Sequence, residues 1–172
     1  MHRRIFVYKY YVNSNRRKAM NVTDRVKNCN GCGACVVACK NRCTKLVPRE
    51  EESLKKVVWA NNDGCMKCNA CSLFCPLFNP VELPHFDEFF EYDKSFDERD
   101  MPALYRQTMR GVKAGQHVEF VGTLCQIAAL KSLSGDKLRP NLIVKPLWCT
   151  EEKRESDPAC AGCMFYADYQ QK

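Results

Sequence analysis

Short apolar runs along the chain alternate with polar segments, and their spacing differs between the two halves. Residues 45–47 and 57–59 have the composition of strands and enclose a charged segment at residues 49–53, which predicts a small hairpin. Farther along, residues 117–122 resemble a strand, residues 126–133 have helical periodicity, and residues 141–144 form a second strand-like run. Strand, helix and strand in this order predict one β-α-β crossover with parallel strands.

Cysteine is unusually frequent, with 13 cysteines among 172 residues. Eight of them form two copies of one run, in which successive cysteines are separated by two, two and three residues. The copies are offset by 36 residues (65 − 29), and Ala34 and Ala70 occupy equivalent positions. The first copy is Cys29, Cys32, Cys35 and Cys39, and the second is Cys65, Cys68, Cys71 and Cys75. The repeat predicts a pseudo-symmetric β/α unit.

Each run has the spacing that binds an iron–sulfur cluster. A cubane [4Fe-4S] cluster takes four thiolates, and the first three cysteines of such a run wrap around three of its corners. Gly31 and Gly33 allow the tight loop that this requires, and Pro76 turns the chain after the last ligand. We expect the fourth cysteine of each run to begin a helix that leads away from its own loop and to complete the other cluster. The expected ligands are Cys29, Cys32, Cys35 and Cys75 for the first cluster, and Cys39, Cys65, Cys68 and Cys71 for the second.

Zinc and disulfide bonds are the alternatives for these eight cysteines. Zinc sites also use cysteine pairs separated by two residues, but a tetrahedral site has no use for a third and a fourth cysteine in each run. The N-terminal segment lacks the apolar centre of a secretory signal, and no stretch approaches the roughly 20 apolar residues of a membrane span. The chain is therefore expected in the cytoplasm, where disulfide bonds are rare.

Four later cysteines are expected to meet at one edge of the second half. Cys125 and Cys149 each follow a strand of the β-α-β unit, so parallel strands would bring both thiols to the edge where such sheets bind ligands. Cys160 and Cys163 form a short pair after a turn at residues 156–158 and can fold back to that edge. A third [4Fe-4S] cluster, a zinc ion and no metal are the alternatives here. Cys43 is left over, and we expect a small buried side chain beside the first cluster.

The net charge of +7 is concentrated at the N-terminus. Six basic residues and no acidic residue precede Met20, and subtracting these six leaves +1 for the rest of the chain. This distribution indicates a basic leader, or a start at Met20, and not a nucleic-acid-binding surface on the body. An edge strand at residues 5–12 is the alternative for the leader, because its aromatic and β-branched content suits a strand.

Two segments of the chain resemble known families. Residues 29–76 resemble the two-cluster bacterial ferredoxin domain, and residues 121–131 (VGTLCQIAALK) resemble the Gly-Thr-Pro-Cys-Gln segment of the coenzyme F420 hydrogenase/dehydrogenase beta-subunit family. The order of the two modules is the same as in that family. The resemblance implies a ferredoxin-like part that feeds electrons to a flavin-containing domain acting on the deazaflavin coenzyme or another acceptor, and it implies a further cluster at the late cysteines.

The chain also departs from this family. Lys40 and Leu124 stand where the related motifs have proline, and the family's Ser- and Gly-rich segment is absent between Pro76 and Gly122. We therefore expect a truncated or internally deleted member that binds neither flavin nor deazaflavin tightly. No glycine-rich dinucleotide motif and no phosphate loop occurs anywhere in the sequence.

Together these patterns predict an α+β fold, in which a ferredoxin-like two-cluster β/α repeat precedes a small partial α/β domain. The expected divisions are a basic leader (1–20), the cluster domain (21–80), an acidic and aromatic linker (81–110) and a partial beta-subunit-like domain (111–172). The phenylalanines of the linker would either pack on a neighbouring domain or cover a cluster; they are Phe86, Phe89, Phe90 and Phe96.

The predicted function is the transfer of single electrons to a redox partner protein or an oxidoreductase subunit. An F420- or flavin-dependent oxidoreductase and a zinc-stapled interaction module are the two alternatives. Iron, sulfide and zinc analysis separates the last from the other two.

Overall fold

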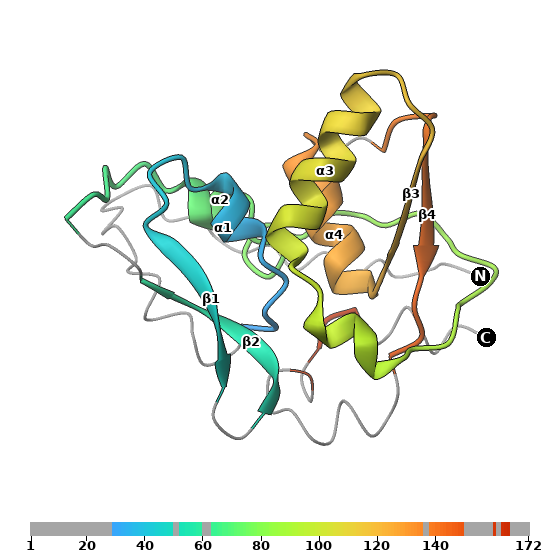
Figure 1. The fold of residues 1–172 in the computed structure, drawn as a ribbon, viewed down its shortest axis with the longest axis horizontal. Coiled ribbons are helices and arrows are strands. Elements are labelled where there is room, and N and C mark those ends of the chain that lie inside the picture. Colours follow the sequence, from blue (N-terminus) through green and yellow to red (C-terminus); the bar gives the residue numbers. More distant parts are fainter. Residues whose placement is uncertain are drawn as a thin grey trace, which may run out of the picture.

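The computed structural model describes residues 29–49, 52–59, 63–135, 138–149, 160 and 163–165. The basic leader, the start at Met20 and the strand expected at residues 5–12 lie outside these residues. Figure 1 shows a hairpin with two short helices beside a layer of two longer helices and two parallel strands. The elements in chain order are α1 (Ala34–Ala38), β1 (Thr44–Arg49), β2 (Glu52–Trp59), α2 (Ala70–Leu73), the 3₁₀ helix η2 (Lys94–Glu98), α3 (Met101–Lys113), β3 (Val118–Gly122), α4 (Leu124–Leu133) and β4 (Leu142–Pro146).

The predicted hairpin is confirmed. Strands β1 and β2 pair antiparallel, with Thr44 opposite Trp59 and Leu46 opposite Val57. The register shifts between Pro48 and Arg49, just before the connection, because proline has no N–H to donate to the ladder.

Helices α1 and α2 occupy equivalent places in the two copies of the cysteine run. Each follows a residue in the left-handed conformation, Gly33 with φ 83° and Asn69 with φ 59°. Each helix contains the third cysteine of its run and ends before the fourth. The expectation that the fourth cysteine begins a helix is therefore wrong. A spacing of four residues is about one helical turn, so the turn is completed between the third and the fourth cysteine.

The predicted β-α-β unit is confirmed. Strands β3 and β4 pair parallel, from Val118 opposite Leu142 to Gly122 opposite Pro146, and α4 connects them. The helix begins at Leu124, two residues earlier than predicted, because Thr123 starts it with a capping box in which the Thr123 N–H donates to Gln126 Oε1 at 3.0 Å.

The segment expected to be a linker is packed against the second half. Phe90 forms a parallel bridge with Leu147, where its N–H donates to the Pro146 carbonyl (2.8 Å) and its carbonyl accepts from the Trp148 N–H (2.7 Å). Leu83 and Phe86 pack against the buried core. Of the two alternatives for this segment, the structure therefore shows packing on a neighbouring part of the fold.

Helix α3 was not predicted, and it runs across the boundary expected at residue 110. Asp100 caps it, since its side chain accepts from the Ala103 N–H at 3.1 Å, and a proline stands in the first turn. Its buried side chains recur every three or four residues, at Tyr105, Thr108 and Val112. This spacing can be seen in the sequence alone, and it is typical of the buried face of a helix.

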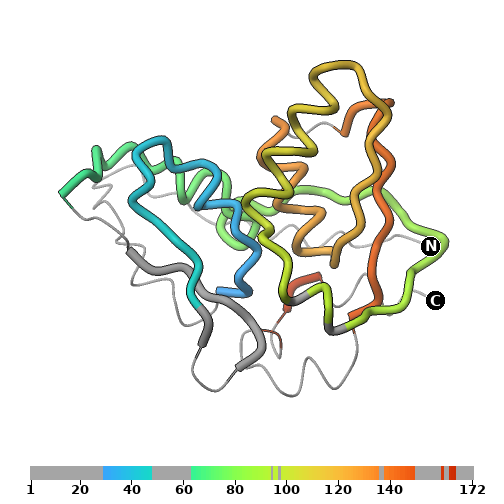
Figure 2. The backbone as a smooth tube through the Cα atoms, viewed as in Figure 1, coloured from blue at the N-terminus to red at the C-terminus, as the bar shows by residue number. Residues whose placement is uncertain are grey.

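One core joins the two halves of the protein. Side chains from α1, α3, β3 and α4 form a single buried cluster, and Figure 2 shows α1 next to α3 and α4. Its members are Cys32, Ala34, Met101, Tyr105, Phe120, Ile127, Ala129 and Leu130. A Cβ added at Gly33 would lie 3.2 Å from Pro102 and 3.3 Å from Leu46, so glycine permits this close approach. The ferredoxin-like half and the β-α-β half therefore stabilise each other.

Candidate metal centre

The fourth cysteine of the first run lies with the first three cysteines of the second run. They line one cavity of about 320 Å³ between the loop after α1 and the loop before α2. The Asn41 side-chain amide donates to the Gly64 carbonyl at 2.7 Å and so ties these two loops together. The cysteines that line the cavity are Cys39, Cys43, Cys65, Cys68 and Cys71.

Cys43 was expected beside the first cluster, and the structure corrects this. It is buried, as predicted, but it lines the cavity with Cys39 and Cys65. Its N–H donates to Cys39 Sγ at 3.1 Å. Burial raises the pKa of Cys43 to about 11, and hydrogen bonds and charge interactions with Cys39 and Cys65 add to the effect. Cys43 lies there because the packing of α1 against α2 brings the loop that follows α1 to the second run.

The remaining cysteine of the second run interacts with the first run. Burial raises the pKa of Cys32, and the charge of Cys75 raises it further. Burial also raises the pKa of Cys35, followed by the charges of Cys29 and Cys75. Cys75 is thus within electrostatic reach of two cysteines of the first run. The Gly31 N–H donates to Cys29 Sγ at 3.4 Å, as in a loop that wraps around a sulfur-ligated centre.

We expect the metal-free protein to lose stability as the pH rises above about 8.5, the ordinary pKa of a cysteine. Burial raises the pKa of Cys32 and Cys35, so the folded state keeps two protons that the unfolded state releases. The stability is complete below the unfolded pKa and falls by up to about 1.4 kcal/mol per pH unit for each thiol above it. Urea unfolding at pH 7, 9 and 10 measures this. A free energy of unfolding that does not fall between pH 9 and 10 contradicts the prediction.

Tyr105 anchors the first cysteine group to the second half of the protein. Its hydroxyl donates to the Cys32 carbonyl at 2.8 Å, and its ring is fully buried and stacks on Phe120 with a centroid distance of 5.7 Å. The sequence analysis missed this residue. Its position on the buried stripe of α3 is the signal that could have found it.

The Tyr105→Phe variant should unfold more readily by about 1–3 kcal/mol, because it leaves the buried Cys32 carbonyl without a donor. Its iron should also be lost faster to a chelator, since that carbonyl belongs to the cysteine loop. Chemical denaturation and chelation kinetics measure the two effects. Unchanged values in both would show that the hydroxyl does not hold the loop.

Three of the four late cysteines lie around a second apolar cluster. Cys125, Cys149 and Cys163 pack against the group formed by Leu124, Ala128 and Phe165. Of the C-terminal pair, Cys163 therefore returns to the edge of the β-α-β unit. Cys160 is buried, and its carbonyl accepts from the Cys163 N–H at 3.1 Å.

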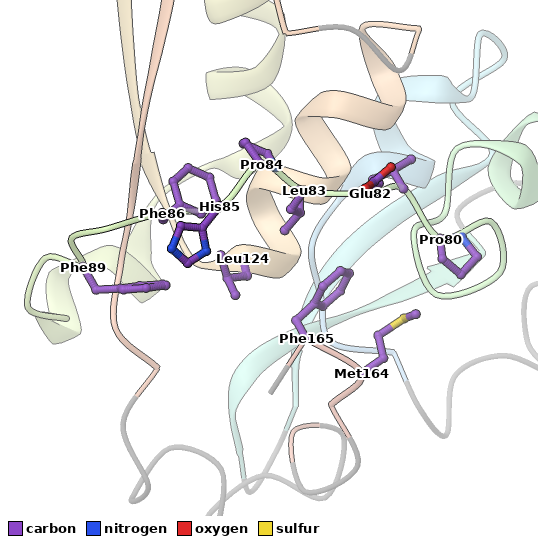
Figure 3. A pocket seen from close by; sticks show the side chains of 11 residues that line it. Pro80, Glu82, Leu83, Pro84, His85, Phe86, Phe89, Leu124, Met164 and Phe165 are labelled. Atoms are coloured by element: carbon purple, nitrogen blue, oxygen red, sulfur yellow. The ribbon is translucent and has the colours of Figure 1, made fainter. Parts of the chain in front are cut away.

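A pocket of about 490 Å³ adjoins these late cysteines, and the sequence analysis did not predict it. Figure 3 shows the segment from Pro80 to Phe89 along one side, with Leu124, Met164 and Phe165 opposite. Two of its lining residues, Leu124 and Phe165, belong to the apolar cluster against which Cys125 and Cys163 pack. Phe86 and Phe89 line the pocket and pack against the same apolar cluster, so the segment expected to be a linker shares this cluster with the late cysteines.

Among the described residues, no three side chains of cysteine, histidine, aspartate or glutamate surround a single point as the ligands of one metal ion would. The thiolates of a four-iron cluster bind four different iron atoms, so they surround a cavity. None of the helices among the described residues has the length and hydropathy that a membrane span requires.

The sequence comparison assigns a class to the first half. A family model described as a 4Fe-4S dicluster domain matches residues 28–79. This match supports an iron–sulfur, ferredoxin-like domain, a metal-binding role and electron transport. Comparisons with curated proteins and with solved structures gave no match. The resemblance of residues 121–131 to the beta-subunit family gains no support from these comparisons and stays a prediction.

Proposed function

We propose that this protein transfers single electrons through two [4Fe-4S] clusters. The main support is the way the cysteines group, since each group combines three cysteines of one run with the fourth of the other. Thiolates in this number and spacing suit iron–sulfur clusters. The proposed ligands are Cys29, Cys32, Cys35 and Cys75 for the first cluster, and Cys39, Cys65, Cys68 and Cys71 for the second.

A bound cluster takes up and releases one electron at a potential that its surroundings set. The chain supplies the thiolates, the burial and the hydrogen bonds. The N–H groups of Gly31 and Cys43 donate to ligand sulfurs, and such bonds stabilise the more negative, reduced state. Cys32 of the first group is buried in the core together with residues of α3 and α4, whereas Cys68 of the second group is exposed. This difference in exposure supports a route in which a partner protein would exchange electrons with the second cluster. Electrons would then pass between the second cluster and the buried first cluster.

The late cysteines lie near the first cysteine group. Cys125 is close enough to Cys32 for its charge to raise the pKa of Cys32. We propose that Cys125, Cys149, Cys160 and Cys163 hold a third cluster, with zinc as the alternative occupant.

Anaerobic purification followed by iron, sulfide and zinc analysis tests the proposal. We expect about eight iron atoms per chain for two [4Fe-4S] clusters, rising toward about twelve if the late cysteines hold a third. Dithionite should bleach the visible absorption, and electron paramagnetic resonance should detect reduced clusters. Fewer than about four iron atoms with stoichiometric zinc would contradict the proposal and favour a zinc-stapled module.

A flavin-dependent oxidoreductase of the beta-subunit type is the second candidate. The pocket lined by Leu124 and Phe165, against which Cys125 and Cys163 pack, is the observation that favours it. Because the Ser- and Gly-rich segment of that family is absent, we expect neither flavin nor deazaflavin to bind tightly. Micromolar or tighter binding in calorimetry would favour the enzyme.

A further inference from the structure

The second cysteine group lies beneath a part of the surface that is both basic and apolar. Cys68 is exposed, and its neighbours Met66 and Leu73 are 69% and 60% exposed, the highest values among the large apolar side chains described. Lys40 lines the cavity, and Lys67 stands between two residues that line it. We call the following residues the basic surface: Lys40, Arg42, Met66, Lys67 and Leu73.

Two residues of the basic surface have a left-handed backbone conformation. Arg42 and Lys67 have positive φ angles of 53° and 54°, a conformation that costs a residue with a side chain about 1 kcal/mol. Such residues persist only where the surrounding structure fixes them. Here the hydrogen bond from Asn41 to the Gly64 carbonyl joins the two loops that carry them. Lys40, Arg42 and Lys67 therefore stand on two adjoining loops.

The exposed charged side chains that the structure describes in the first half are mostly positive. Within residues 29–80, the exposed basic side chains that the structure describes are Lys40, Arg42, Lys45 and Lys67, whereas Asp63 is the acidic one. The apolar centre with a charged rim is the usual composition of a protein interface. Positive charge on such a rim accelerates association with a negative partner.

We propose that the basic surface docks a one-electron redox protein with acidic residues around its own cofactor. This inference rests on the proposed function, because an exposed cysteine of the second group gives the partner its shortest route to a cluster. One electron leaves the reduced protein and enters the partner's cofactor, and no bond forms or breaks. The contact is small and transient, as electron-transfer interfaces usually are.

Two haem proteins of opposite charge serve as probes. The reduced full chain is mixed in stopped flow with ferricytochrome b5, which is acidic, or ferricytochrome c, which is basic, and each haem iron goes from ferric to ferrous. The test variant is Lys40→Glu/Lys67→Glu. The matched control is Lys113→Glu/Arg139→Glu, which makes the same charge change at exposed positions on α3 and before β4.

We expect the test variant to react about tenfold more slowly with cytochrome b5 at low salt, and faster with cytochrome c. A change in the potential of the cluster would move both rates in the same direction, so opposite changes identify docking. Salt should slow the native reaction with cytochrome b5, and carbodiimide should cross-link Lys67 to that protein. The control variant should behave like the native chain.

Equal rates for the native chain and the test variant, or cross-links confined to other lysines, would overturn the docking inference. Rates that fall with both cytochromes would overturn it too, since they indicate an altered cluster. Loss of binding to a single-stranded oligonucleotide with no change for cytochrome b5 would assign the surface to nucleic acid instead. A failure of the proposed function can be distinguished from a failure of the docking inference, because the purified chain would then contain no reducible iron before any mixing experiment.

Discussion

The Cys75→Ser variant should lose the cluster held by the first cysteine run and keep the other. Cys75 is 40 residues away from Cys35 (75 − 35), yet its charge raises the pKa of Cys32 and of Cys35. The charge of Cys71 also raises the pKa of Cys35, but Cys71 lines the cavity of the second group and Cys75 does not. A serine hydroxyl is a weak ligand for iron beside a thiolate, so the affected cluster should lose one iron atom or dissociate. Iron should fall from about eight toward about four atoms per chain.

The reciprocal variant, Cys39→Ser, should damage the second cluster, because Cys39 lines the cavity of Cys65 and Cys68. Paramagnetic NMR with selectively labelled cysteine assigns the contact-shifted signals that remain in each variant. Cys43→Ser is the matched control, since Cys43 lines the same cavity without being a proposed ligand and should leave both clusters in place. If Cys39→Ser disturbs only the signals of Cys29, Cys32 and Cys35, ligation is local and the crossed arrangement is wrong.

The Phe120→Ala variant should lower the free energy of unfolding by about 3–5 kcal/mol. Phe120 is fully buried on β3 and stacks on Tyr105, in the core that α1 shares with the second half. Removing the ring leaves a cavity in that shared core, so both halves should be affected. Such a loss is a large part of the roughly 5–15 kcal/mol that stabilises an ordinary domain.

Chemical denaturation of the loaded protein, followed by circular dichroism and by visible absorption, measures the effect. The matched control is Ile143→Ala on the neighbouring strand β4, where the side chain is 53% exposed and should contribute little. We expect the two signals to change together in Phe120→Ala. Visible absorption that persists after the circular dichroism of the second half is lost would show that the halves are stabilised separately.

Sequence patterns that act over a few residues were sufficient for the local elements. The charged segment at residues 49–53 predicted the hairpin, and strand, helix and strand in succession predicted the parallel pair β3 and β4. The cysteine spacing gave the iron–sulfur class that the family comparison supports. The capping Asp100 and the buried stripe of α3 are also local signals, but the acidic and aromatic composition before the helix predicts a linker that continues through it.

The spacing of the cysteines does not by itself explain where the fourth cysteine of each run lies. The crossed ligation predicted from the sequence stays a prediction, and the reason offered for it is wrong, since α1 and α2 end before Cys39 and Cys75. What carries these residues to the opposite group is the packing of the two helices against each other. The same packing places Cys43 beside the second group, which no feature of its own neighbours in the sequence indicates.

By itself the sequence determined the two cysteine runs, the hairpin and the β-α-β unit, because backbone geometry and thiolate spacing are decided among near neighbours. Only the tertiary structure decided that the two halves share one core, that Tyr105 holds the Cys32 loop, and that a pocket adjoins the late cysteines. These features depend on side chains far apart in the sequence, which meet only when apolar faces are buried against each other.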